Sequence, residues 1–231
     1  GLVLTCPQTA RVEPAPPMPP DLAEVESLPA QFLQPAPPEP KPPRPLAPSR
    51  PAGSEPAVQG PLAEDGASAF LRGRLIHRLL EMLPELDATA RADAAARFLA
   101  RPAHGLSEEA QQDIAVEVLA VLAAPAVAPL FGAGSRAEVP LAAVLGETVI
   151  SGQVDRLLVA EDHVLVVDYK SGRPAPPAES AIPEAYLAQM AGYRAALRAI
   201  FPGREIRAAL LFADGPKLIW LPDALLDRHA P

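Results

Sequence analysis

The chain has 231 residues and a formal net charge of −8, and more than half of its 31 prolines lie in the first 61 residues. This acidic balance argues against tight, unaided nucleic-acid binding, because lysine and arginine contacts to phosphate supply most of the non-specific affinity. The single cysteine, Cys6, excludes a disulfide framework, a four-cysteine zinc site and a cysteine-ligated iron–sulfur cluster built by this chain alone.

The proline-rich segment 1–61 is expected to be an extended linker or a strap along the surface, with a ligand for a proline-recognition partner as the alternative. The remaining residues, 62–231, are enough for one folded domain with a single core. The longest apolar run, 118–131, is short and contains Pro125 and Pro129, so no membrane span is expected. No signal peptide is visible, so the cytoplasm is the expected location. Because the sequence starts with glycine, we expect it to be a fragment of a larger protein.

Hydrophobic periodicity and the placement of proline and glycine predict the elements of this domain. In chain order these are helices at 67–83, 87–100 and 107–124, a short strand at 136–139, hairpin strands at 147–159 and 163–170, a helix at 183–200, and strands at 206–213 and 217–221. Helices that alternate with strands in this way predict an α/β fold with a small mixed sheet flanked by helices.

The hairpin carries the most informative residues. Asp155 and Asp168 are equidistant from the turn at Glu161 and Asp162, so a hairpin centred there places them opposite each other, with Cβ atoms about 5 Å apart. Two carboxylates so placed repel each other and need a counter-charge, which a divalent cation with oxygen ligands supplies. Lys170 shares the face of Asp168. Two acids and a lysine at a metal suit phosphodiester hydrolysis, whereas a solvated strand face is the alternative.

Two helices place further polar residues at helical spacing. Gly73, His77 and Glu81 share one face of the first helix, and Gln189 and Tyr193 share one face of the helix at 183–200. Gly73 costs about 1 kcal/mol in a helix interior relative to alanine, which predicts a close approach by another part of the backbone. Taken alone, His77 is more typical of a hydrogen-bonded structural residue, and Tyr186 and Tyr193 are more typical of core aromatics.

Together these motifs resemble the RecB-like branch of the PD-(D/E)XK nucleases, above all the C-terminal nuclease domain of AddA-type helicase–nucleases, over about 68–221. The motifs are G-x-x-x-H at 73–77, G-x-x-D-R at 152–156, D-Y-K-S at 168–171 and Q-x-x-x-Y at 189–193. The resemblance implies a restriction-endonuclease-like core preceded by the proline-rich segment. It also implies a Mg²⁺-dependent exodeoxyribonuclease, with Mn²⁺ as a substitute, that processes double-strand breaks in recombinational repair.

The resemblance further implies partners and residue roles. The DNA would be a single strand delivered by a helicase motor, and the full-length protein would join an AddB-like subunit. This chain has no G-x-x-x-x-G-K-[ST] loop, so it contributes no nucleotide site. The implied metal ligands are His77, Asp155, Asp168 and the carbonyl of Tyr169. The implied catalytic residues are Asp155, Asp168 and Lys170. The residues implied to bind DNA or support the lysine are Gln189, Tyr193 and Arg156, and further candidates for the site are Glu138 and Glu81.

Two alternatives stay open at this point. One is a stand-alone RecB-family exonuclease that works without a motor. The other is a non-catalytic scaffold in which the nuclease fold docks a partner.

Overall fold

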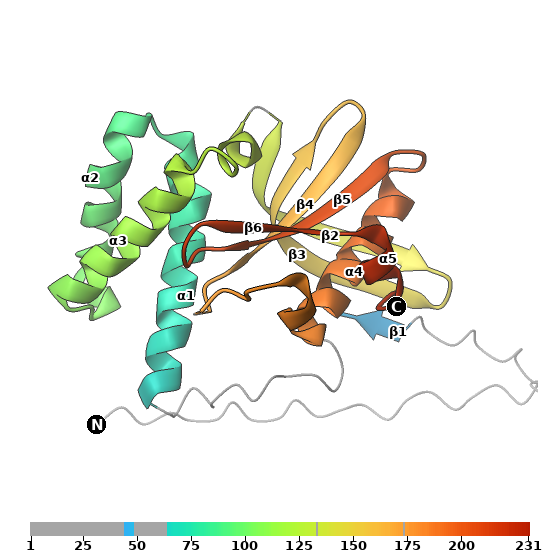
Figure 1. The fold of residues 1–231 in the computed structure, drawn as a ribbon, viewed down its shortest axis with the longest axis horizontal. Coiled ribbons are helices and arrows are strands. Elements are labelled where there is room, and N and C mark those ends of the chain that lie inside the picture. The colour runs from blue at the N-terminus through green and yellow to red at the C-terminus, as the bar shows by residue number, and fades with distance from the viewer. Residues whose placement is uncertain (1–43, 49–63, 133, 173) are drawn as a thin grey trace, which may run out of the picture. The chain divides into compact units, whose positions relative to one another are not determined.

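The computed structural model describes residues 44–48, 64–132, 134–172 and 174–231. Residues Pro42–Pro231 form a compact unit that contains a six-stranded mixed sheet. The strands are β1 (Arg44–Leu46), β2 (Ser135–Leu145), β3 (Thr148–Val159), β4 (His163–Lys170), β5 (Glu205–Phe212) and β6 (Lys217–Leu221). Their order is β1-β3-β4-β5-β6, with β2 paired to β3, as Figure 1 shows. The β1–β3 and β4–β5 pairs are parallel and the others are antiparallel.

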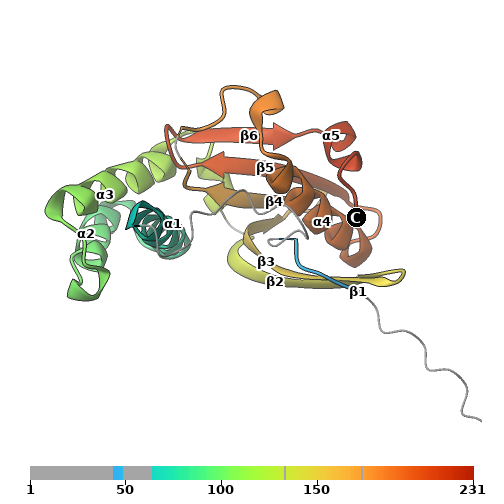
Figure 2. The same ribbon diagram turned by 90° about the horizontal axis from the view of Figure 1, so that it is seen from below.

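Helices cover both faces of the sheet (Figure 2). They are α1 (Glu64–Met82), α2 (Ala88–Leu99), α3 (Glu108–Ala123), α4 (Glu184–Ile200) and α5 (Asp223–Asp227), with short 3₁₀ helices at Leu83–Glu85, Pro102–His104, Ala128–Phe131 and Glu179–Ala181. Leu165 and Val167 of β4 pack in one core with α1, α2 and α3, whereas Val164 and Val166 pack in a second core with α4 and α5. Because successive strand residues face opposite sides, a strand buried on both faces carries a continuous apolar run, as β4 does from Val164 to Val167.

The predicted fold class is confirmed: the protein has a mixed sheet flanked by helices. The predicted helices and hairpin strands lie within a few residues of the observed ones. The strand predicted at 136–139 is longer, because β2 runs from Ser135 to Leu145 through Pro140. Proline is tolerated there since, among the described residues, β2 pairs only with β3, so no described strand on its other edge needs the missing N–H. None of the helices in the described part of the chain is long and apolar enough to cross a membrane.

β1 comes from the segment that was expected to be a linker or strap. Arg44–Leu46 pairs with Thr148–Ile150 of β3, and the buried Pro48 follows. A Cβ atom on Gly192 would lie 3.1 Å from Cγ of Pro48, and one on Gly152 would lie 3.5 Å from its Cδ. The two glycines therefore form a notch that Pro48 fills, called here the proline notch. The rest of segment 1–61 lies outside the described residues.

Candidate active site

The two acids of the hairpin lie where the strands separate. The predicted register is confirmed, since β3 pairs with β4 from Arg156 opposite Val167 to Val159 opposite Val164. Continued by one residue, this register places Asp155 opposite Asp168, but the ladder stops before that pair. Instead, the backbone N–H of Tyr169 donates a hydrogen bond to Oδ2 of Asp155 at 2.6 Å. The carboxylate of Asp155 thus holds the strand end that carries Asp168.

A second interruption lies on the other side of Asp155. β2 pairs with β3 residue by residue except at Glu138, which stands opposite Asp155. Glu138 has a φ of 50° and is the only non-glycine residue in the described chain with a positive φ. This left-handed conformation is uncommon for a residue with a side chain, and such strain concentrates at functional sites. The side chain of Gln153 holds the Glu138 carboxylate, with Nε2 donating to Oε2 at 2.7 Å.

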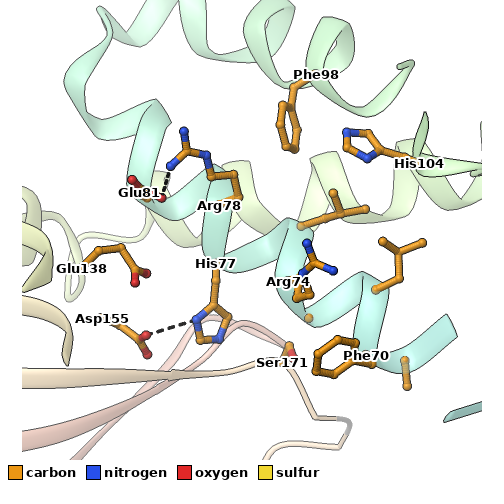
Figure 3. A pocket seen from close by; sticks show the side chains of 14 residues that line it. Phe70, Arg74, His77, Arg78, Glu81, Phe98, His104, Glu138, Asp155 and Ser171 are labelled. Carbon is orange, nitrogen blue, oxygen red and sulfur yellow. Dashed lines mark hydrogen bonds and ion pairs between the residues drawn. The ribbon is translucent and has the colours of Figure 1, made fainter. Parts of the chain in front are cut away.

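These interruptions bring three potential metal ligands together. His77 of α1, Glu138 of β2 and Asp155 of β3 offer ligand atoms that all lie within 4.8 Å of one another. Figure 3 shows both carboxylates beside the imidazole, and Nδ1 of His77 lies 3.2 Å from Oδ1 of Asp155. One imidazole and two carboxylates are a donor set that fits Mg²⁺ or Mn²⁺. This group is called here the ligand triad; it includes two of the predicted ligands and adds Glu138, while Asp168 lies outside it.

Negative charge dominates the ligand triad. Burial lowers the pKa of His77, but its hydrogen bond to Asp155 and the charges of Asp155, Asp168 and Glu138 outweigh burial, so the pKa is raised. Burial and the charges of Asp155 and Glu81 raise the pKa of Glu138, against the smaller opposing effects of His77 and Gln153. Both shifts favour an added positive charge, which a proton or a metal ion supplies.

Lys170 lies in a cage of polar and aromatic groups. Its Nζ is 2.7 Å from Oδ2 of Asp168, donates to Oε1 of Gln189 at 2.9 Å, and lies 3.9 Å from the ring centroid of Tyr186. Nε2 of Gln189 donates to Oδ1 of Asp168 at 2.9 Å, which closes a ring of three side chains. Burial raises the pKa of Asp168, although the charge of Lys170 opposes the shift. The prediction that Lys170 shares the face of Asp168 is confirmed.

Tyr193, another residue expected to contact DNA or support the lysine, contacts the lysine cage only through Gln189. Its hydroxyl donates to the carbonyl of Gln153 at 2.7 Å and lies 3.5 Å from Nε2 of Gln189. Its side chain is fully buried, so it stiffens the contact between α4 and β3 and does not face a ligand.

Arg156 occupies a different position from the one expected. It is 1% exposed, and its guanidinium donates to the hydroxyl of Tyr169 at 3.0 Å and to the carbonyl of Leu80 at 2.8 Å. Strand alternation explains this position, because Arg156 pairs with Val167 and therefore faces α1, away from Lys170. Arg156 joins β3 to α1, so it belongs to the scaffold of the site.

α1 closes over the end of β4 because of Gly73. A Cβ atom at this position would lie 2.7 Å from Oγ of Ser171, the residue after Lys170, so the close neighbour is a side-chain hydroxyl and not the backbone that was predicted. Nη1 of Arg72 also donates to the carbonyl of Ser171 at 3.1 Å. Glu81 lies farther along α1, where it pairs with Arg78 and faces the ligand triad without joining it.

A groove of about 700 Å³ runs along α1 from the ligand triad (Figure 3). It is called here the α1 groove, and its lining includes Phe70, Arg74, His77, Arg78, Glu138 and Asp155. Phe70 and Arg74 in the groove and Tyr186 in the lysine cage were not among the site residues expected from the sequence. A signal existed for the first two, since Phe70, Arg74, His77 and Glu81 follow one another at spacings of three or four on one helix face.

One comparison with known proteins, a family model, identifies the kind of domain. The family model described as the PD-(D/E)XK nuclease superfamily matches residues 54–224. Two solved structures are similar over part of the chain. The similarity to the structure of SSO0001, at 14% identity and a TM-score of 0.30, covers 71% of this chain and 82% of the SSO0001 chain. The similarity to protein VC1899 from Vibrio cholerae, at 14% identity and a TM-score of 0.28, covers 65% of this chain and 48% of the VC1899 chain. A search of the curated proteins found no match.

Proposed function

Because the chain belongs to the PD-(D/E)XK nuclease superfamily, we propose that it is a metal-dependent deoxyribonuclease that hydrolyses phosphodiester bonds. One observation carries the proposal: the ligand triad and the lysine cage meet at the end of the hairpin. Asp155 of the triad accepts a hydrogen bond from the N–H of Tyr169, and Tyr169 lies between Asp168 and Lys170 in the chain. The hydrogen bond thereby joins the candidate cation site to the residue next to the lysine ammonium.

His77, Glu138 and Asp155 would hold Mg²⁺ or Mn²⁺ in this scheme. Asp168, a further ligand by the family resemblance, lies in the same negative field, because its charge contributes to the raised pKa of His77. A bound divalent ion supplies an acidified water as nucleophile and neutralises charge on the phosphate.

Lys170 provides the second element of the chemistry. Its ammonium, oriented by Asp168 and Gln189, would stabilise negative charge that develops on the phosphate oxygens or orient the attacking water. The contact with Tyr186 restricts the lysine from another side. Such preorganisation matters because an oriented charge needs no rearrangement at the moment of reaction.

The test is cleavage of end-labelled DNA at low salt with Mg²⁺ or Mn²⁺. We expect Asp155→Ala and Lys170→Ala each to lower the rate about 100-fold or more, whereas Arg228→Ala, an exposed arginine far along the chain, keeps it. Calorimetry with Mn²⁺ should separate the two variants: Asp155→Ala loses metal affinity and Lys170→Ala retains it. Equal cleavage by the parent and both site variants would refute the proposal.

We further propose that the chain is the nuclease module of an AddA-type helicase–nuclease in the cytoplasm, acting in recombinational repair with an AddB-like partner. The support is the motif resemblance together with the net charge of −8, which suits a strand delivered by a motor better than one captured from solution. An exonuclease needs a DNA end, so linear single strands should be degraded and covalently closed single-stranded circles should survive. Equal loss of the circles would contradict the exonuclease assignment.

A further inference from the structure

The α1 groove extends beyond the groups used in catalysis. His77 at one end belongs to the ligand triad, whereas Phe70 and Arg74 line the part toward the start of α1. Phe70 is seven residues from His77, which corresponds to about 10 Å along a helix axis. This part of the groove therefore continues directly from the catalytic centre and has no role in the chemistry proposed above.

Phe70 is an exposed aromatic side chain inside the groove. It is 62% exposed, although it lies on the same helix as fully buried residues such as Leu79. The guanidinium carbon of Arg74 lies 5.9 Å from the centroid of its ring. An aromatic ring beside an arginine, in a groove that ends at a reactive centre, is the combination with which proteins bind single-stranded nucleic acid.

Arg74 is the groove's available positive charge. Within the described part of the chain, Arg78 forms an ion pair with Glu81, whereas no acidic side chain pairs with Arg74. In a chain with a net charge of −8, a cation without an acidic partner next to a metal site is well suited to meet a phosphate.

We infer that Phe70 and Arg74 form a platform that binds single-stranded DNA and leads it to the ligand triad; this inference rests on the proposed nuclease function. A base stacks on Phe70 and the adjoining phosphate contacts Arg74. The strand is single because a base inside a duplex has no free face to offer the ring. At the 3.4 Å rise of stacked bases, the 10 Å between Phe70 and His77 spans about three nucleotides. The stacked base thus lies about three nucleotides from the bond that is cut.

The experiment is equilibrium binding of a labelled oligo-dT strand to the full chain at low salt, with Ca²⁺ in place of Mg²⁺. We expect Phe70→Ala to weaken binding about tenfold, Phe70→Trp to restore it, and Arg74→Gln to weaken it and flatten the salt dependence. Trp220→Ala is the matched control, since Trp220 is 50% exposed and lies outside the groove lining. Because Phe70 is exposed, its replacement leaves the core intact.

Two further measurements distinguish a stacking platform from a structural role. A 2-aminopurine placed about three nucleotides from the cut should be quenched by the parent and not by Phe70→Ala, while Mn²⁺ affinity stays the same in both. Three results would each overturn the platform: unchanged binding in Phe70→Ala, an equal loss of binding for duplex DNA, or no binding of single strands by the parent. If the groove binds a peptide instead of DNA, the parent will bind no single strands. Failure of the nuclease proposal is a separate outcome: no cleavage with Mg²⁺ or Mn²⁺ while the platform still binds.

Discussion

Gln189 holds both charged groups of the lysine cage with a single amide. Its oxygen accepts from Lys170 and its nitrogen donates to Asp168, so Gln189→Leu removes both bonds and lets the ammonium move. We expect the turnover number to fall about 10- to 100-fold, while Mn²⁺ affinity stays within about twofold because Gln189 is no member of the ligand triad. Steady-state kinetics and calorimetry measure the two effects. The control is Gln111→Leu, which removes a side-chain hydrogen bond from α3 to the backbone carbonyl of Leu106. Equal turnover in both variants would contradict this role.

The raised pKa of His77 makes metal affinity depend on pH. A metal ion binds the neutral imidazole, so protonation of His77 competes with metal binding. Because the pKa of His77 is raised, this competition extends above pH 6.5, the ordinary pKa, and protonation of Glu138, whose pKa is also raised, adds to it. We expect Mn²⁺ affinity to rise from about pH 6 to about pH 8. Calorimetric titration at three pH values checks this, and His77→Gln should bind more weakly with a flatter dependence. An affinity that is constant over this range would contradict the assignment of His77.

The same pKa shift changes the stability of the protein without metal. The pKa of His77 is higher in the folded state than the 6.5 of the unfolded chain, so the folded state binds the proton more tightly. The resulting stabilisation is fully present below about pH 6.5 and is lost as the pH rises through the folded-state value. In EDTA, the difference in melting temperature between the parent and His77→Gln should therefore become smaller from pH 6 to pH 8. A difference in melting temperature that grows with pH would contradict a raised pKa of His77 in the folded state.

At the level of elements, Gly73 determines how closely α1 approaches the end of β4. Alanine is favoured over glycine in a helix by about 1 kcal/mol, but its Cβ would lie 2.7 Å from Oγ of Ser171 and would displace the residue after Lys170. We expect Gly73→Ala to keep or raise the melting temperature and to lower the cleavage rate about tenfold.

The compensating variant for this contact is Ser171→Ala. It removes the hydroxyl and leaves Cβ of residue 171 at 3.8 Å, an ordinary contact. The double variant Gly73→Ala/Ser171→Ala should recover the rate of Ser171→Ala alone. If it stays as slow as Gly73→Ala, the close approach does not control the geometry of the site.

The elements that the sequence predicted are those defined by local patterns. The hairpin register followed from the turn residues and from apolar strands, in which a slip of one residue would expose a buried face. β1 could not be predicted, since three residues in a proline-rich stretch form a strand only through pairing with β3, over 100 residues away in the chain. Arg156 could have been placed, because strand alternation already assigns it to the face opposite Lys170.

The ligand set was only partly predictable for a different reason. His77 and Asp155 belong to motifs whose spacing is visible in the sequence. Glu138 joins them because β2 adopts a positive φ at that residue, and nothing in the propensities of glutamate signals such a conformation. Tyr186 looked like a core aromatic, and its contact with Lys170 depends on how α4 packs against β4.

For the molecule as a whole, the sheet depends on a strand from the proline-rich segment. Since Pro42–Pro231 is a compact unit, a variant lacking residues 1–41 should melt within about 2 °C of the parent. A variant lacking residues 1–48 loses β1 and empties the proline notch, so we expect its melting temperature to fall by roughly 5–10 °C. Calorimetry compares the two, and equal melting temperatures would mean that β1 and Pro48 contribute nothing to stability.

The left-handed conformation of Glu138 sets the proposed activity of this protein against its heat resistance. Holding a side-chain residue at this φ costs about 1 kcal/mol or more, and glycine would remove that cost. Directed evolution that selected only for survival at high temperature would therefore favour Glu138→Gly and discard one of the two carboxylates proposed to hold the metal. A thermostable variant for laboratory use has to be stabilised elsewhere and screened for cleavage in every round.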